Sequence, residues 1–340
     1  MGTRRISAIV ATALVALLAA GCASEELASR DAAPPSAGES AQPGRPADDA
    51  VQSPFGTSDY TPLPVRQRPY EVTRLVDVTD AARHPVDKGG VAVYVAKSGE
   101  QLNHPVVLTQ YGISALSEYR ETGEPVWLER AAANANRLLE IAVERDRALF
   151  FPYEFDWTYY DRTLSAPWFS GMAQGQALSL FSRLSEEQPG EARWRDAADQ
   201  TWASFEQKRS ESEPWTTLID RGNLWFEEYA GDQPPLLVLN GHIFAIFGLY
   251  DYFSIRKQDA TVAEYFDGAT TTVLANMALI RKAGGLSYYC AQADYCRSDL
   301  WQNSKYHGIH QDQLRMLGEM TGSKEFGEWA DTLEADLAVP

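Results

Sequence analysis

Four short segments, spaced almost evenly along the chain, constrain the fold more than any other feature. Each places a glycine beside a polar residue at an expected helix start, and the glycines are Gly112, Gly175, Gly241 and Gly308. Their spacings of 63, 66 and 67 residues indicate an internal repeat. A more polar segment with apolar residues three or four apart follows each one, which is typical of a helix with one buried face. Because stacked pairs bury their apolar faces only against neighbours, the sequence predicts an all-α fold: an α/α toroid of about four inner–outer helix pairs.

The start of the chain predicts export. Arg4 and Arg5 precede an apolar stretch from Ile9 to Ala20, which is too short to span a membrane. The sequence Ala19-Ala-Gly-Cys22 resembles a bacterial lipobox and predicts lipidation of Cys22, with an ordinary secretory signal as the alternative. We therefore expect residues 1–22 to be a signal peptide and residues 23–58, which hold hardly any large apolar side chain, to be a disordered tether. The expected location is the bacterial cell envelope, with a lipid anchor in the membrane.

The rest of the chain divides into an extended or β-hairpin region at residues 59–104 and the helical domain at 105–340. A formal net charge of −17 makes nucleic acid an unsuitable partner. In an exported protein, Cys290 and Cys296 predict a small-loop disulfide. A zinc site built with His307 and His310 is the alternative, but no close cysteine pair or acidic partner completes it. We expect no metal and no cofactor.

Aromatic residues crowd the loops that precede the inner helices. They include Phe155, Trp157 and Tyr159 before the second inner helix, and Tyr288, Tyr289 and Tyr306 before or at the start of the fourth. In a toroid these loops gather at one end of the ring. Aromatic faces suit the apolar faces of sugars, although about half of such residues should belong to the core. The loops therefore favour a carbohydrate ligand.

Five separated motifs resemble the C-terminal catalytic region of D-glucuronyl C5-epimerase, the enzyme that converts D-glucuronic acid to L-iduronic acid within heparan-type polymers. They occur in the family's order between about Pro105 and Trp329, and they are Gln110-Tyr-Gly-Ile-Ser114, Trp168-Phe-Ser-Gly-Met-Ala-Gln-Gly-Gln176, Trp225-Phe-Glu-Glu-Tyr229, Leu239-Asn-Gly241 with Gly248-Leu-Tyr-Asp251, and Tyr306-His307 with His310 and Gln313-Leu314. The vertebrate enzymes carry a β-sandwich after the first inner helix, but here Tyr119 runs almost directly into Pro125. Whether the resemblance extends to a homodimer stays open, because dimer contacts that this domain provides in the family have no counterpart here.

The resemblance implies four catalytic residues, namely Glu228, Tyr229, Tyr306 and Tyr288, the last because it precedes the tyrosine of the Tyr-His motif by 18 positions. It also implies substrate contacts from Trp168, Gln176, His307 and His310. Two departures from the family's motifs are Lys305, in place of an acid, and His242, in place of an aromatic. Further candidates follow from the chemistry, with Arg162, Arg221 and Lys305 to bind a carboxylate and Gln174 and Asn240 to donate hydrogen bonds.

Inverting carbon 5 of a uronic acid removes a proton α to a carboxylate and returns it to the opposite face. The site must stabilise a dianionic intermediate and hold one proton-transfer group on each face of the ring. Glu228 and Tyr306 fit these roles, so the predicted function is an isomerase, a glucuronyl C5-epimerase acting on a heparosan-like polysaccharide. Two alternatives stay open: a uronate lyase, which begins with the same proton loss, and a non-catalytic, envelope-tethered glycan-binding protein.

Overall fold

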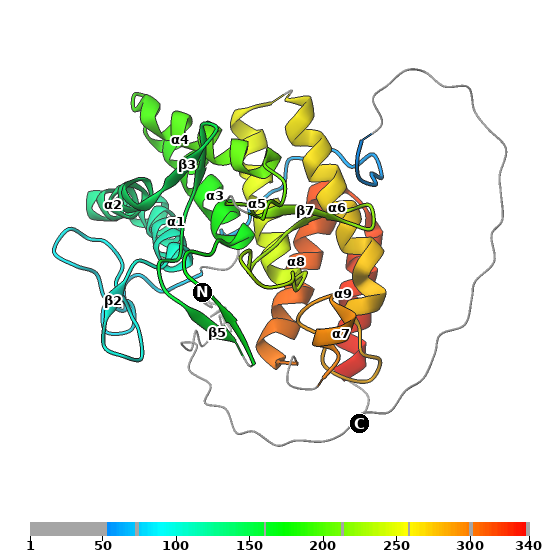
Figure 1. Ribbon diagram of the computed structural model, residues 1–340. Helices are drawn as coiled ribbons and strands as arrows, with labels where there is room; N and C mark the ends of the chain where they lie inside the picture. Colours follow the sequence, from blue (N-terminus) through cyan, green and yellow to red (C-terminus); the bar gives the residue numbers. More distant parts are fainter. Residues whose placement is uncertain are drawn as a thin grey trace, which may run out of the picture. The chain divides into compact units, whose positions relative to one another are not determined.

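The computed structural model describes residues 53–337 except 72–74, 160, 212–213, 258 and 299–301. The predicted signal peptide, Cys22 and most of the predicted tether lie outside these residues. Helices dominate the described part and form four consecutive pairs (Figure 1). The pairs are α1 (Pro105–Thr122) with α2 (Pro125–Ile141), α3 (Gly171–Glu187) with α4 (Ala192–Glu206), α5 (Leu239–Ile255) with α6 (Ala260–Ile280), and α8 (Ser304–Thr321) with α9 (Lys324–Leu337). The predicted toroid architecture of inner–outer pairs is confirmed.

Local sequence explains where several of these helices begin and end. Ser170 caps α3 by accepting a hydrogen bond from the Ala173 amide, and Asn303 caps α8 in the same way. Gly123 and Gly322 end α1 and α8 in the left-handed conformation, with φ angles of 71° and 72°. Short turns therefore join each inner helix to its outer partner. No helix in the described part of the chain combines the length and the apolar character needed to cross a membrane.

The inner helices pack in sequence order, α1 on α3, α3 on α5 and α5 on α8. The closest approach joins α3 to α5, because a Cβ atom on Gly175 would lie 2.3 Å from Ala245 Cα and one on Gly248 would lie 2.2 Å from the Gly175 carbonyl oxygen. Only glycine allows backbones so near each other. The two ends of the row, α1 and α8, share little contact within the described residues.

Three β-hairpins fill the loops that lead into α3 and α5, where the sequence indicated only loops. Before α3 lie β3 (Val143–Arg145) with β4 (Ala148–Phe150), and β5 (Trp157–Tyr159) with β6 (Arg162–Leu164). Before α5 lie β7 (Thr217–Asp220) and β8 (Asn223–Phe226). All three pairs are antiparallel. The four-residue helix α7 (Ala293–Cys296) lies in the loop before α8.

The described residues between 53 and 103 form a strap that crosses the helices, and only a small part of the strap is a hairpin. Its hairpin part is limited to β1 (Tyr94–Val95) and β2 (Gln101–Leu102), and Tyr70, Glu71, Leu75 and Val76 lie in turns and bends. The strap contacts most inner helices and two outer ones through main-chain hydrogen bonds, donated by Ser58 to Asp267, by Leu63 to Met320, by Val65 to Tyr250, by Val76 to Ser114 and by Ala92 to Asn134.

A buried ion pair fixes the strap at the ends of α3 and α5. The Arg183 guanidinium donates to Asp251 over 2.7 Å, and both side chains are almost fully buried. Arg68 of the strap donates to the same carboxylate over 3.0 Å. The two cations lower the pKa of Asp251 even though burial acts to raise it. These contacts lie at the C-terminal ends of the inner helices, which leaves the N-terminal ends to the hairpins and loops.

The loop aromatics divide as expected between the core and the surface. Phe150, Phe151, Trp225 and Phe226 are fully buried and belong to the main core. Phe155, Trp157, Tyr159, Tyr229, Tyr288 and Tyr306 keep part of their surface exposed. The partly exposed set therefore gathers beside the N-terminal ends of α3, α5 and α8, where the sequence placed a carbohydrate site.

Candidate active site

The loop after β8 positions two consecutive glutamates in different ways. The Glu227 carboxylate accepts hydrogen bonds from the amides of Tyr229, at 3.0 Å, and Leu237, at 2.9 Å. Its main chain bonds to Thr216 and to Gly171 at the start of α3. Glu227 is therefore a buried residue whose hydrogen bonds hold the loop at residues 227–237 in place. This role could not be predicted from the sequence, because the family motif points only to the second glutamate.

Glu228 turns toward the start of α5. Its Oε2 atom lies only 2.2 Å from where a Cβ atom on Gly241 would be, so the repeated glycine makes room for the carboxyl group. Glu228 is 9% exposed, and Oε2 has no hydrogen-bond partner among the described residues. The Tyr289 hydroxyl donates to Oε1 over 3.1 Å. Burial raises the pKa of Glu228 to about 8, against the lowering effect of the Tyr289 hydrogen bond.

Four tyrosines surround this carboxyl group. The hydroxyls of Tyr229 and Tyr289 are 3.2 Å apart, and the ring centroids of Tyr289 and Tyr306 are 4.6 Å apart. Tyr159, from the β5–β6 hairpin, stacks on Tyr229 at 5.4 Å. Burial, and then the charge of Glu228, raises the pKa values of Tyr229 and Tyr289 well above 10. These tyrosines are therefore neutral hydrogen-bond donors at ordinary pH.

The structure brings Glu228, Tyr229 and Tyr306 together as the sequence predicted, but it places Tyr289 in the cluster in place of Tyr288. The Tyr288 ring lies 4.7 Å from the guanidinium of Arg297, and its main chain pairs with Gln302. Consecutive residues in an extended segment point to opposite faces. Tyr289 is therefore the tyrosine that bonds to Glu228, one residue from the position that the spacing of 18 residues indicated, and a catalytic role for Tyr288 stays a prediction.

The three predicted carboxylate-binding cations lie in different surroundings. Arg221 is exposed at the tip of the β7–β8 hairpin, roughly 16 Å from the other end of β8 at about 3.3 Å per residue. It is therefore too far from Glu228 for the predicted role. Arg162 bonds to the Pro234 carbonyl and lies 4.8 Å from the Tyr295 ring. Lys305 is exposed, with its Nζ atom 5.8 Å from the centre of the Tyr306 ring.

Among the amide side chains predicted for the site, Gln174 has its donor occupied, whereas the Gln176 amide nitrogen has no partner among the described residues. The Gln174 amide nitrogen donates to Leu149 and Ser204, and its oxygen accepts from the Phe151 amide, so Gln174 holds the β4 segment and has no free donor for a substrate. Gln176 is fully buried and accepts from the Thr109 hydroxyl over 3.0 Å. Asn240 is 2% exposed at the start of α5, where its main-chain carbonyl accepts from the Gln313 amide and its side-chain Oδ1 atom has no partner among the described residues. Gln313 is a partner that its place in a motif could have suggested.

Trp168, His307 and His310 are buried next to the site and hold its loops in place. Trp168 is 3% exposed and stacks on Tyr153 with ring centroids 3.8 Å apart. His307 accepts from the Ser287 amide and bonds to the Leu333 carbonyl oxygen, while His310 bonds to the Ser287 hydroxyl. Burial lowers the pKa of His310 to about 3, so its ring is neutral. The histidines therefore tie the loop of Tyr289 to α8 and α9 instead of contacting a substrate.

Two further features hold the loop before α8. Cys290 and Cys296 are joined in a disulfide directly after Tyr289. The hydroxyl of Tyr295 donates to Asp161 in the turn of the β5–β6 hairpin. Among the described residues, no three histidine, cysteine or carboxylate side chains gather closely enough to hold a metal ion.

His242, the other departure from the family's motif, has a structural role. Its ring accepts from the Phe226 amide over 3.1 Å and bonds to the Ala269 carbonyl over 3.0 Å. It therefore joins β8 to α6 across α5, and burial lowers its pKa to about 4.

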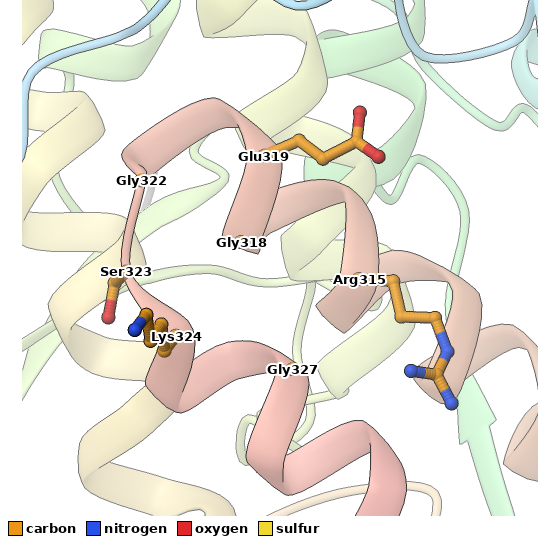
Figure 2. A pocket seen from close by; sticks show the side chains of 7 residues that line it. All are labelled: Arg315, Gly318, Glu319, Gly322, Ser323, Lys324 and Gly327. Carbon is orange, nitrogen blue, oxygen red and sulfur yellow. The ribbon is translucent and has the colours of Figure 1, made fainter.

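A separate depression of about 320 Å³ lies at the opposite end of α8 (Figure 2). It is lined by residues of the α8–α9 turn, namely Arg315, Gly318, Glu319, Gly322, Ser323, Lys324 and Gly327. At about 1.5 Å per residue, Gly318 lies roughly 18 Å along α8 from Tyr306. The depression is therefore distinct from the carboxyl–tyrosine cluster.

An α/α toroid with a carboxyl–tyrosine cluster at the N-terminal ends of its inner helices defines the class of this protein. A crystal structure of D-mannose isomerase has a similar fold, with a TM-score of 0.50, 12% identity, and coverage of 73% of this chain and 63% of that one. The cellobiose 2-epimerase from Spirochaeta thermophila aligns with a TM-score of 0.47 and 12% identity over 67% of this chain and 57% of that one.

The sequence comparison is more specific. Residues 145–334 match the family described as D-glucuronyl C5-epimerase C-terminus, and the chain belongs to this family. A D-glucuronyl C5-epimerase of Caenorhabditis elegans is 24% identical over 184 residues, which cover 50% of this chain and 29% of that protein. The matched region thus corresponds to less than a third of the relative's length.

Proposed function

We propose that this protein is a carbohydrate epimerase that inverts carbon 5 of D-glucuronic acid residues in a polysaccharide. The single observation that carries the proposal is Glu228, a buried carboxyl group with a pKa of about 8 in one cluster with four tyrosines. Membership of the D-glucuronyl C5-epimerase C-terminus family supports it. The substrate we propose is a heparosan-like polymer, in which glucuronate alternates with an uncharged sugar.

The proposed reaction begins with loss of the carbon 5 proton to the Glu228 carboxylate. A base with a pKa near the working pH is both available in its ionised form and strong enough to accept a proton. Tyrosine is suited to return a proton to the opposite face, because a phenol with its ordinary pKa of about 10 is protonated at neutral pH. We assign that role to Tyr306. The hydroxyls of Tyr289 and Tyr229 tune Glu228 through the hydrogen bond at Oε1 and the contact between them.

The substrate carboxylate needs neutralising groups, since proton loss creates a second negative charge beside it. Lys305 is a basic residue whose Nζ atom lies 5.8 Å from the centre of the Tyr306 ring. The first turn of α5, which opens without a side-chain cap at Val238, adds the partial positive charge of a helix N-terminus close to Glu228. In the proposed mechanism both favour the dianionic intermediate.

We also propose that the protein acts outside the cytoplasm, tethered to the bacterial cell membrane through lipidated Cys22. This proposal rests on the sequence of residues 1–22, which precede the described part of the chain. Mass spectrometry of the membrane fraction should detect a diacylglyceryl group on Cys22, and Cys22→Ala should release the protein into the soluble fraction. An unmodified, soluble wild-type protein would contradict the anchor.

The activity is tested by incubating the full chain with heparosan in heavy water and following carbon 5 by NMR. Deuterium should enter at carbon 5, and iduronate signals should appear. Tyr306→Phe should abolish both changes, and Glu228→Gln should reduce exchange by at least about a hundredfold, the usual contribution of a positioned acid or base. Arg221→Gln, at the distant hairpin tip, serves as the matched control with unchanged exchange. Absorbance from unsaturated uronates in place of iduronate would establish lyase chemistry instead.

A further inference from the structure

We propose that the outer part of the site is a separate sugar-binding subsite, formed by an aromatic row, for an uncharged sugar neighbouring the reacting glucuronate. The aromatic row consists of Tyr94, Phe155 and Trp157. This inference rests on the proposed function, because it identifies the second sugar class of the same polymer.

The row is continuous with the Glu228 cluster. The Trp157 ring lies 6.4 Å from Trp168, and Trp168 lies 6.0 Å from Tyr229, the neighbour of Glu228. Outward from Trp157, Phe155 follows at 6.5 Å and Tyr94 of β1 at 6.1 Å from Phe155. A chain that places one sugar at Glu228 therefore passes next along these rings.

The row offers ring surface to a ligand instead of to the core. Phe155, Trp157 and Tyr159 alternate with exposed Glu154, Asp156 and Thr158, so the rings share one face of the β5 segment. Each ring of the row is only partly buried, in contrast to Tyr153 and Trp168 beneath it, which are 1% and 3% exposed. The supporting layer holds the rings, and the outer ring surface is left for stacking.

An unsatisfied hydrogen-bond donor marks the same place. The indole Nε1 atom of Trp157 is buried and finds no acceptor among the described residues. A buried indole N–H normally has a partner. Trp168, by comparison, donates to the Phe155 carbonyl over 2.9 Å. A sugar hydroxyl that displaces the side chains covering this atom would supply the acceptor that Trp157 lacks.

Charge selects the class of sugar. The acidic side chains Glu154 and Asp156 are exposed on the opposite face of the same segment, and Asp232 contacts the Ser165 amide near the end of β6. The formal net charge of the chain is −17. A second uronate would be repelled here, whereas an uncharged sugar binds without electrostatic repulsion from these carboxylates. A second copy of this acidic chain would be repelled as well.

The test measures binding separately from turnover. Oligosaccharides of alternating glucuronic acid and N-acetylglucosamine are titrated by calorimetry into the full chain carrying Glu228→Gln, which prevents turnover. Adding Trp157→Ala should raise the Kd for an octasaccharide about tenfold. Trp157→Phe, which keeps a ring but lacks the N–H, should raise it about threefold. Thr158→Ala, an uncharged position on the opposite face of the same segment, is the matched control and should leave the Kd unchanged.

Several outcomes would overturn the subsite. One is an unchanged octasaccharide Kd in a Trp157→Ala protein whose urea midpoint matches the parent. Another is a change from dimer to monomer on the same substitution, which would show that the row covers a second copy. With Glu228 intact, Trp157→Ala should raise KM for the octasaccharide while leaving kcat unchanged. If wild-type protein binds the octasaccharide through Trp157 but exchanges no deuterium, the proposed epimerase activity fails and the subsite stands.

Discussion

Replacing Glu228 by glutamine should stabilise the fold progressively, relative to wild type, as the pH rises from about 5 to about 8. The reason is the raised pKa of this buried carboxyl group. Below the pKa of 4.5 that Glu228 has without these surroundings, it is protonated in both the folded and the unfolded state and has no pH-dependent effect. Above pH 4.5 the carboxyl group ionises in the unfolded chain but stays protonated in the folded protein. Folding then requires uptake of a proton, so the folded state becomes less stable as the pH rises. The loss is complete above about 8.

The magnitude follows from the two pKa values. Each pKa unit corresponds to about 1.4 kcal/mol, so the full difference between 4.5 and about 8 amounts to about 5 kcal/mol. Between about pH 5 and about pH 8 the expected part is about 3 kcal/mol. Glutamine has a similar shape and can still accept from Tyr289. Any constant effect of the substitution is therefore the same at every pH and does not alter the slope.

The assay is urea unfolding followed by tryptophan fluorescence, at several pH values in this range, for wild type and Glu228→Gln. The difference in unfolding free energy between the two proteins is plotted against pH. Glu154→Gln, at an exposed position just before β5, is the matched control. A flat line for Glu228→Gln would refute the reasoning, because it would mean that Glu228 ionises in the folded protein as it does in water.

Three further perturbations test the arrangement around Glu228. Tyr289→Phe removes a hydrogen bond that lowers the pKa of Glu228, so the rise of kcat/KM with pH should move to higher pH. An unchanged pH profile would show that the Tyr289 hydroxyl does not affect the pKa of Glu228. Gly175→Ala should lower the free energy of unfolding, measured in urea, by at least about 3 kcal/mol, because the added Cβ would meet the backbone of α5. Gly308→Ala adds a Cβ that meets nothing within 4 Å, so it should raise the free energy of unfolding by about 1 kcal/mol. Equal effects of the two alanines would contradict the close packing of α3 on α5. Replacing both Cys290 and Cys296 by serine should lower stability by about 2 kcal/mol and reduce kcat more than KM, since Tyr289 loses its anchor, and unchanged kcat would show that the loop holds without the disulfide.

Features that depend on local sequence could be predicted well. The helix pairs follow from apolar residues three or four apart, and their ends follow from capping residues such as Ser170 and Gly322. Glu228 was found because a short motif carries it. The hairpin β5–β6 was missed, although the alternation of Phe155, Trp157 and Tyr159 with polar residues signals a strand.

The partners of each side chain could not be read in the same way, because they come from distant parts of the chain. Gln174 appears in the sequence as a free amide, but Leu149, Phe151 and Ser204 take up its hydrogen bonds. Arg221 follows the same helix pair as Glu228 in sequence, but a hairpin carries it to the far end of two strands. Nothing in the local sequence records either arrangement.

The sequence by itself therefore determined the repeat of helix pairs, the glycines that let their backbones meet, and the glutamate at the centre of the site. Periodicity and chain spacing are properties of neighbouring residues, and they persist in any fold that buries the apolar faces. Only the tertiary structure decided that Tyr289 rather than Tyr288 meets Glu228, because a shift of one residue reverses the face to which an extended chain directs its side chains. It also decided the raised pKa of Glu228, since desolvation depends on every element packed around the carboxyl group and on none of them alone.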